Sequence, residues 1–362
     1  MALIPILQEI CSLQPHYSSE NISPMQRRGV LIRSALPDAV RAFEADLRND
    51  LEEFGDDFII DASDGIGRKT EAPWVRVASK RMSGSAREGF YLVVHFSRDG
   101  SAFWITIGFG STLWTNGELR PFPDEELARR RSWARQEISH RFGTLAPFED
   151  VISLGASANL PRVFEKATAI ARRFDPATAS ESDIVAAIRD GVKRLVPLYR
   201  GQTVGANLTG SQLAEIEIEE VSNPVRAGSN AQGFGLSGPE RRVIELRAMA
   251  LAREWLLAHG YTARDCSATA SYDFAASRDG RELKVEVKGT TSSALDGFVM
   301  TRNEVELHTR EQGETILILV SSIRLDRSGA EPIATGGLVE VLQGWDIGTF
   351  SLEPMAYRVT RN

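Results

Sequence analysis

With 362 residues the chain is long enough for two or three domains, and its 42% hydrophobic and 25% charged residues are typical of a soluble globular protein. A net charge of −7 argues against a general polyanion-binding protein, and no apolar run is long enough for a membrane span. The five histidines form no zinc-like cluster, and Cys11 and Cys266 lie too far apart to indicate a disulfide framework. Since signal-peptide features are also absent, we expect a cytoplasmic protein without a membrane partner.

The first part of the chain predicts an α+β domain over residues 1–220. Residues 37–54 carry apolar side chains at three- and four-residue spacing, the pattern of an amphipathic helix. Four strands are predicted next, the last two joined by an Asp-Gly turn: Phe58–Asp61, Trp74–Ala78, Phe90–Ser97 and Ala102–Phe109. Helical patterns return at Asp124–Phe142, Pro161–Phe174 and Ser182–Leu198. The expected sheet is short, antiparallel and rich in aromatic residues.

A glycine-containing loop at residues 63–70 lies in a locally basic stretch. Between Ala62 and Arg98 there are seven Lys and Arg against three Asp and Glu. Such a basic surface on an acidic protein suits selective attraction to phosphates. A solvated loop with the usual share of Lys and Arg explains the same count equally well. The loop sequence Gly-Arg-Lys-Thr departs from a phosphate-binding loop and no strand-to-helix context follows, so we predict no nucleotide binding.

The large aromatic side chains of these strands allow two interpretations. Most of them, Phe96, Phe103 and Trp104 included, are expected in the core, because alternation along a strand requires such residues. A basic loop beside an aromatic strand suits a protein that stacks a nucleic-acid base. Trp74 and Tyr91 are the two exceptions, and the second of the family resemblances given below is the reason for selecting them.

A stretch rich in Gly, Ser, Asn and Pro at residues 221–236 predicts an exposed linker before a second domain at residues 237–362. Ser237 and Glu240 form a capping box that starts a helix ending near His259. The predicted elements that follow are a strand-like region up to Asp273, a strand at 283–289, a helix at 302–311 and an apolar strand at 315–321. This order indicates an α/β layered core with its carboxylates at one sheet edge.

The strand around Glu286 carries residues suited to metal-dependent phosphodiester cleavage. Glu286 and Lys288 are two residues apart and therefore project from the same face of the strand. Mg²⁺ takes one or two carboxylates and keeps water and substrate phosphate, so Asp273, Glu286 and the carbonyl of Val287 are the predicted metal ligands. Lys288 could orient the attacking water or stabilise the anionic transition state, and Glu245 on the preceding helix could reach the same site. For Glu-x-Lys alone, an exposed strand face with a cross-strand ion pair is the alternative.

The element order resembles the PD-(D/E)XK nuclease superfamily, and more closely a family of small C-terminal domains (DUF3883-like) appended to prokaryotic defence proteins. The matching blocks lie within residues 237–324: Val243-Ile244-Glu245, Gly260-Tyr261, Tyr272-Asp273-Phe274, Glu286-Val287-Lys288-Gly289-Thr290 and Thr301-Arg302-Asn303-Glu304. The resemblance implies a nuclease-like α/β fold in which Asp273, Glu286 and Lys288 are catalytic and Glu245 joins them. It also implies that Asn303 and Glu304 contact DNA or metal.

A second resemblance covers residues 37–198. Gly-x-Gly, a short polar stretch, Pro-Trp and a Gly-Phe-Tyr strand with a hairpin resemble the N-terminal DNA-recognition domain of McrB-type modification-dependent restriction systems, which flips a modified cytosine into an aromatic pocket. The resemblance implies that Trp74 and Tyr91 line such a pocket and that Arg68 and Lys69 contact the flanking phosphates. Ile66 occupies the loop position where the best-known member has an aromatic residue, which leaves the identity of the modified base open.

Together these features predict a modification-dependent, type IV-like restriction endonuclease. Residues 1–220 would recognise double-stranded DNA that carries a modified cytosine, and residues 237–362 would cleave it with Mg²⁺. A non-cleaving DNA-binding module that recruits a partner and a nuclease without modification preference remain alternatives. Because one active site per chain cleaves one strand, we expect a homodimer, at least on DNA.

Overall fold

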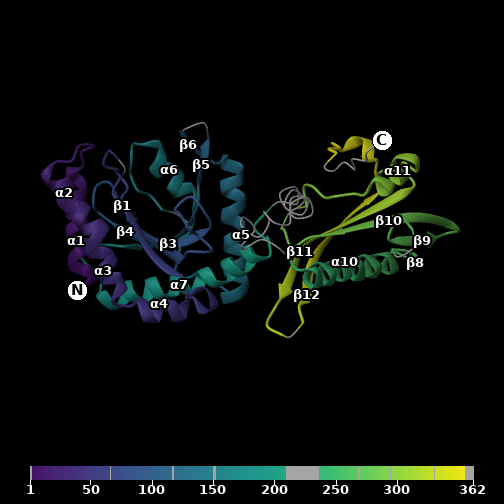
Figure 1. Ribbon diagram of the computed structural model, residues 1–362, viewed down its shortest axis with the longest axis horizontal. Helices are drawn as coiled ribbons and strands as arrows, with labels where there is room; N and C mark the ends of the chain where they lie inside the picture. The colour runs from purple at the N-terminus through teal and green to yellow at the C-terminus, as the bar shows by residue number, and fades with distance from the viewer. Residues whose placement is uncertain are drawn as a thin grey trace, which may run out of the picture. The chain divides into compact units, whose positions relative to one another are not determined.

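The computed structural model describes residues 2–65, 67–115, 118–149, 152–208, 236–267, 270–293, 295–329 and 331–354. Its contacts divide the chain into two units, Met1–Gly201 and Gln202–Asn362 (Figure 1). Apart from Leu236, the predicted linker at residues 221–236 lies outside the described residues. Within the described ranges, no helix has the length and apolar character needed to cross a membrane.

The N-terminal unit is built on a five-stranded antiparallel sheet with the order β1-β2-β3-β4-β7. Its strands are β1 (Phe58–Ser63), β2 (Trp74–Ser79), β3 (Phe90–Phe96), β4 (Phe103–Phe109) and β7 (Thr168–Phe174), and a separate hairpin pairs β5 (Thr112–Thr115) with β6 (Glu118–Pro121). All four predicted strands are confirmed. The strands β3 and β4 are buried along their whole length, which explains why their sequences are apolar without clear alternation.

Helices surround this sheet: α1 (Leu3–Leu13), α2 (Ser23–Val30), α3 (Leu36–Arg41), α4 (Glu44–Asp50), α5 (Asp124–Phe142), α6 (Asn159–Lys166) and α7 (Glu181–Thr203). The single helix predicted at residues 37–54 is wrong in detail, because α3 and α4 are separate there. The helix predicted at 161–174 is wrong in its second half, where β7 pairs with β4. Its apolar run, Ala169–Ala171, is short and fully buried, so periodicity alone could not distinguish strand from helix.

The two faces of β3 pack against different helices. Leu92 lies against Gly191 of α7, where an added Cβ would come within 2.3 Å of Leu92 Cδ1, so glycine allows this close approach. Tyr91 and His95 point to the opposite face, on which Phe164 of α6 stacks against the His95 ring. Figure 1 shows α7 and α6 on opposite sides of the sheet.

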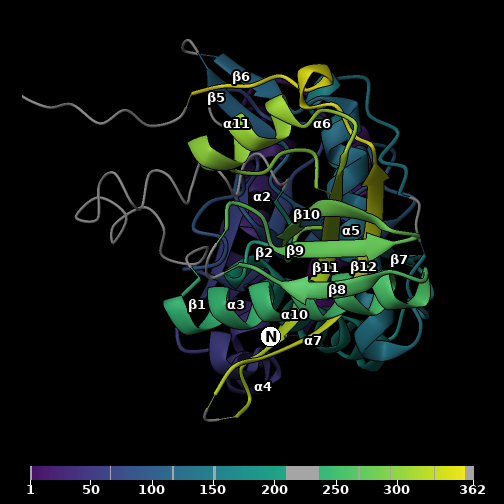
Figure 2. The ribbon, with the colours of Figure 1, turned by 90° about the vertical axis from the view of Figure 1, so that its right-hand side faces the viewer.

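The C-terminal unit contains a mixed five-stranded sheet with the order β12-β11-β10-β9-β8, in which β10 and β11 are parallel and the other pairs antiparallel. Its elements are α10 (Gly238–Ala258), β8 (Thr262–Asp265), β9 (Phe274–Arg278), β10 (Arg281–Gly289), α11 (Arg302–Arg310), β11 (Thr315–Asp326) and β12 (Ile333–Gln343). Figure 2 shows β8, β9 and β10 side by side. The prediction that the carboxylates lie at a sheet edge is wrong, because β10 is the central strand.

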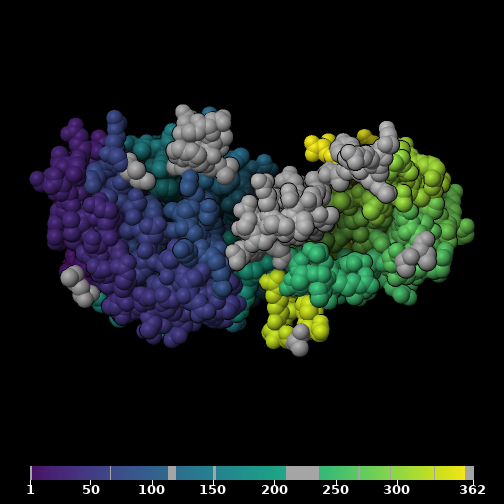
Figure 3. All heavy atoms as spheres, in the orientation of Figure 1, coloured from purple at the N-terminus to yellow at the C-terminus, as the bar shows by residue number. Residues whose placement is uncertain are grey.

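The strand β11 divides the core of this unit into two layers. Ile316, Ile318 and Val320 pack with α10, whereas Leu317 and Leu319 pack with Trp345 and the α11 side. A strand buried on both faces explains the continuous apolar run at residues 315–321. Beyond α10 the β11–β12 hairpin projects from the unit (Figure 3).

Candidate functional site

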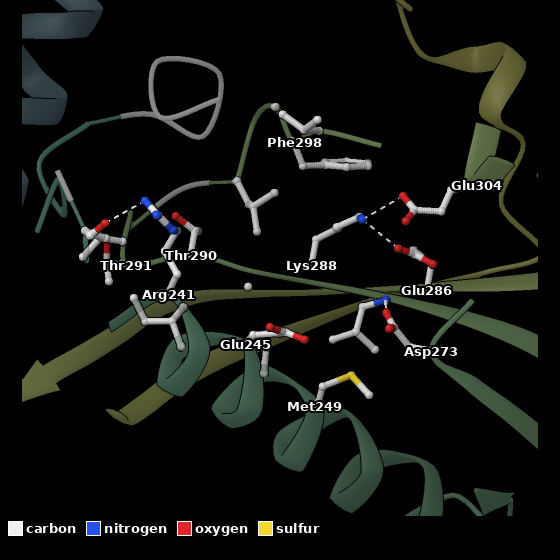
Figure 4. Close-up of a pocket in the computed structure, with 18 residues that line it drawn as sticks. Arg241, Glu245, Met249, Asp273, Glu286, Lys288, Thr290, Thr291, Phe298 and Glu304 are labelled. Carbon is white, nitrogen blue, oxygen red and sulfur yellow. Dashed lines mark hydrogen bonds and ion pairs between the residues drawn. The ribbon is translucent and has the colours of Figure 1, made fainter. Parts of the chain in front are cut away.

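Glu286 and Lys288 lie together on the central strand β10, with Asp273 beside them (Figure 4). The Lys288 Nζ is 2.7 Å from Glu286 Oε1 and 3.0 Å from Glu304 Oε2. Glu286 is only 3% exposed. The alternative of an exposed cross-strand ion pair is therefore wrong, because this ion pair lies within one strand and joins a buried carboxylate to a half-buried lysine.

Asp273 reaches the site because β9 begins one residue later, at Phe274, so Asp273 itself is not part of the strand ladder with β10. The last ladder pair joins Phe274 to Val285, so the next part of β10 lacks a strand on that side. The Asp273 carboxylate takes the place of a strand carbonyl and accepts a hydrogen bond from the Val287 amide at 2.8 Å. Since the amide and carbonyl of one strand residue leave on the same side, the Val287 carbonyl faces the Asp273 side as well. Asp273 thus precedes β9, which corrects the strand predicted up to this residue.

A cavity of about 400 Å³ lies over these residues and brings in the helices. Glu245 of α10 is exposed, forms an ion pair with Arg242 at 2.9 Å, and reaches toward the cavity from below (Figure 4). Gly289 lets α10 approach β10 closely, because a Cβ there would lie 2.6 Å from Ala248 Cβ. Among the described residues that line the cavity, Glu304 is present and Asn303, exposed on the first turn of α11, is not.

Burial and like charge control the protonation of this cluster. Burial raises the pKa of Glu286 to about 7, against the opposing effect of Lys288 and with a further rise from Asp273. Burial likewise raises the pKa of Asp273, although the Val287 amide opposes it. Burial alone would lower the pKa of Lys288, but the carboxylates of Glu286 and Glu304 outweigh it and raise that pKa. Lys288 is therefore a cation at neutral pH, and when Asp273, Glu286 and Glu304 are all ionised this one cation leaves the cluster with excess negative charge.

These residues fit a divalent cation with few protein ligands. Within the described ranges, no group of three or more His, Cys, Asp and Glu side chains is arranged to hold a metal. Mg²⁺ does not need such a group, because it usually binds through one or two carboxylates together with water and substrate phosphate. The desolvated carboxyls of Asp273 and Glu286 and the Val287 carbonyl make up a donor set of that kind. The chemistry of the donor set is therefore compatible with Mg²⁺.

Glu304→Gln separates the electrostatic role of this residue from its helix-capping role. Glu304 forms a capping box with Thr301 and also bonds Lys288. Glutamine can replace glutamate in a capping box, so the free energy of unfolding should change by less than about 1 kcal/mol. Loss of the carboxylate should lower the pKa of Lys288, as measured by NMR of labelled lysine. An unchanged Lys288 titration would contradict this role for Glu304.

In the N-terminal unit, Trp74 and Tyr91 line one small cavity of about 30 Å³ between the sheet and α6. Trp74 is half-buried, whereas Tyr91 is 8% exposed, with Arg76 over its ring at 5.5 Å and its hydroxyl donating to the Ala86 carbonyl at 3.0 Å. The structure thus brings the two selected aromatic residues together.

The basic loop contributes less free positive charge than its composition indicates. Lys69 is 12% exposed and forms an ion pair with Asp64 at 2.5 Å, and Arg33 pairs with the same carboxylate. Arg76 is fully buried and pairs with Asp61. Arg68 is exposed, and Ile66 lies outside the described residues. Of the two predicted phosphate contacts, only Arg68 therefore presents its side chain to solvent.

Asp64→Asn should destabilise the N-terminal unit through this loop. The Asp64 side chain is 1% exposed, and although burial raises its pKa, hydrogen bonds from Arg33 and Lys69 outweigh burial and lower it. Removing the charge leaves Lys69 partly buried without its partner, at an expected cost of about 1–3 kcal/mol in urea unfolding. Asp38→Asn, which breaks the exposed pair with Arg41, should cost less than about 0.5 kcal/mol. Equal effects of the two substitutions would refute the explanation.

Sequence reasoning missed several residues that line the two cavities, among them Arg241, Phe298 and His95. A signal existed for Arg241, which lies four residues before Glu245 and so on the same helix face. His95 is two strand residues beyond Val93 and four beyond Tyr91, which places it on the Tyr91 face. Phe298 belongs to a segment without regular structure, where no periodicity applies.

Two family matches cover most of the chain. Residues 13–200 match the family described as MrcB-like, N-terminal domain, and residues 244–332 match the family described as Protein NO VEIN, C-terminal. Comparison with curated proteins and comparison with solved structures each return no match. The two family matches support a domain architecture of the restriction type. Since the first match spans just over half of the residues, the chain belongs to the MrcB-like N-terminal domain family.

Proposed function

We propose that the protein is a modification-dependent DNA endonuclease of the type IV-like restriction class. Its N-terminal unit would bind double-stranded DNA by flipping a modified cytosine, and its C-terminal unit would hydrolyse a phosphodiester bond with Mg²⁺. The observation that carries the cleavage activity is the cluster of Asp273, Glu286 and Lys288 beside a cavity of about 400 Å³. Two desolvated carboxyls next to a half-buried cation are the groups that such hydrolysis requires.

Each residue of the cluster has a defined chemical part in this proposal. Asp273, Glu286 and the Val287 carbonyl would hold Mg²⁺. When bound, Mg²⁺ lowers the pKa of a coordinated water and neutralises charge on the phosphate. Lys288, charged and held between two carboxylates, would hydrogen-bond the attacking water and stabilise the anionic transition state. Glu245 stands on the solvent side of the cavity, where it would position water.

The recognition step rests on the N-terminal unit. The family match there and the cavity shared by Trp74 and Tyr91 support binding of a flipped base. Arg68 is the exposed cation of the loop that would contact a flanking phosphate. Cleavage of both strands would require two chains on one DNA, so we also propose a dimer in the bound state, measurable by sedimentation with and without DNA.

Plasmid cleavage tests the proposed function. With Mg²⁺, the wild type should cleave a cytosine-modified plasmid faster than an unmodified one, and Glu286→Ala and Lys288→Ala should cleave neither. A panel of modified DNAs would identify the base. Retained cleavage by both variants would refute the active site. Tight binding of modified DNA without any cleavage would instead favour the non-cleaving module that recruits a partner.

Stability without metal should depend on pH through Glu286. Its pKa in the folded protein, about 7, exceeds its usual value of 4.5. The folded protein therefore favours the protonated carboxyl, and its contribution to the free energy of unfolding is complete below pH 4.5. As the pH rises through about 7, the free energy of unfolding should fall by on the order of 3 kcal/mol. Glu286→Gln should flatten the pH profile of urea unfolding in a chelator, and Mg²⁺ should stabilise the wild type more than this variant. Superimposable profiles would contradict the burial of an ionisable Glu286.

A further inference from the structure

The aromatic cavity of the N-terminal unit, lined among others by Trp74, Tyr91 and His95, contains a buried polar side chain that the described residues around it leave unsatisfied. The Tyr91 hydroxyl donates to the Ala86 carbonyl at 3.0 Å, and the Thr168 hydroxyl donates to the Phe164 carbonyl at 2.9 Å. His95 is 4% exposed, and its buried Nδ1 has no hydrogen-bond partner among the described residues. Leaving such a group unpaired costs about 1–3 kcal/mol, so it points to a partner that arrives from outside.

Packing holds the His95 ring in place at this cavity. Its ring stacks on Phe164, with centroids 5.8 Å apart and planes 23° apart, and His95 is the direct partner of Trp74 in the β2–β3 ladder. Burial lowers the pKa of His95 to about 4, so the ring is neutral at neutral pH. A neutral imidazole has one donor and one acceptor nitrogen and can therefore pair with a specific edge of a base.

We propose that His95 is the specificity-determining residue of the aromatic cavity and that its Nδ1 accepts a hydrogen bond from the 4-amino group of a flipped cytosine derivative. This inference rests on the proposed function, in which Trp74 and Tyr91 enclose the ring of that base. An apolar cavity discriminates poorly between similar rings, whereas a buried polar group rejects a ring that leaves it unpaired. Cytosine carries an amino donor where thymine carries a carbonyl acceptor, so an acceptor at His95 selects the former.

The cavity must widen to admit a base. About 30 Å³ accommodates only one or two water molecules. Tyr91 and His95 are buried on the central strand β3, whereas Trp74 is half-buried. We therefore expect the Trp74 side chain to be the one that shifts to admit a base. Gly108 supplies a way to reduce the space without touching His95. A Cβ there would lie 3.4 Å from Val93 Cγ1 and 3.5 Å from Tyr91 Cε2, which is ordinary contact.

The test compares duplexes whose bases carry the same 5-substituent but differ in having a 4-amino group (with an unprotonated N3) or a 4-carbonyl group (with an N3 proton). Duplexes with 5-methylcytosine or 5-hydroxymethylcytosine are paired with duplexes that carry thymine or 5-hydroxymethyluracil at the same site. The wild type should bind the cytosine member of each pair at least about tenfold more tightly. His95→Phe keeps the ring packing and removes the nitrogens, so this ratio should fall toward one while the melting temperature is maintained. Gly108→Ala should weaken binding of both members alike.

A second variant keeps the test decisive if His95→Phe folds poorly. His95→Gln offers an amide that can present either its oxygen or its amino group, so it should retain affinity for the cytosine duplex and lose the discrimination. Unchanged discrimination in both variants, with Trp74→Ala abolishing the preference for modified DNA, would overturn the role of His95 and leave the proposed function intact. A wild type without preference for any modified duplex would overturn both.

Discussion

Lys288→Met is expected to reduce the rate of DNA cleavage by at least about 100-fold, the usual effect of removing one group that stabilises an anionic transition state. Lys288 is the cation held by both Glu286 and Glu304. Methionine preserves the unbranched apolar part of the side chain and lacks only the terminal ammonium, so the cavity should largely keep its shape. The measurement is a single-turnover rate on modified plasmid, with DNA affinity determined separately. The rate should fall while affinity for modified DNA, which we propose to be a property of the N-terminal unit, stays within about twofold.

Lys284→Met is the matched control for this prediction. Lys284 lies on the same face of β10, four residues earlier, and pairs with Glu311 at partial exposure outside the cavity. Breaking that pair should cost less than about 1 kcal/mol and leave the cleavage rate nearly unchanged. If Lys284→Met slowed cleavage as much as Lys288→Met, the loss would reflect damage to the strand. If Lys288→Met cleaved normally, Lys288 would have no catalytic part.

Trp74→Ala is expected to abolish the preference for modified DNA. Stacking of one base on an aromatic side chain contributes about 1–3 kcal/mol, equivalent to roughly a 5- to 150-fold change in affinity. Trp74 is the half-buried wall of the aromatic cavity, so its loss should open the cavity without removing a core residue. Binding of modified and unmodified duplexes, compared at the same salt concentration, measures the effect. The affinity for modified DNA should fall to that for unmodified DNA.

Trp74→Phe distinguishes stacking from general packing at this position. Phenylalanine retains an aromatic face on which a base can stack, so the Trp74→Phe variant should recover most of the preference for modified DNA that Trp74→Ala loses. If Trp74 served folding alone, its replacement would change protein stability and not the preference between modified and unmodified DNA. The salt dependence of binding should be equal in the wild type and both variants, because no phosphate contact is removed. A Trp74→Ala variant that still preferred modified DNA would show that this cavity does not receive the base.

Local patterns predicted the elements that carry the candidate site. The Glu-x-Lys spacing placed Glu286 and Lys288 on one strand face, and the 2.7 Å ion pair confirms that geometry. The capping box at Ser237 and Glu240 predicted the start of α10. These predictions succeeded because side-chain direction in a strand and hydrogen bonding at a helix start depend on residues close in sequence. Residues 168–174 were assigned wrongly because their strand structure depends on pairing with β4.

The sequence by itself determined which residues could perform the chemistry, since residue type and short-range spacing identify carboxylates, a cation and an aromatic pair. Only the tertiary structure decided their environment. Asp273 meets the Val287 amide because β9 begins one residue later, and Glu304 meets Lys288 because α11 packs over the same face of β10. For the same reason Lys69 is neutralised by Asp64, and the Nδ1 of His95, beside Trp74, finds no hydrogen-bond partner in the part of the chain that the structure describes. Burial and pairing arise from segments far apart in the chain, and they decide which of these polar groups can bind a ligand.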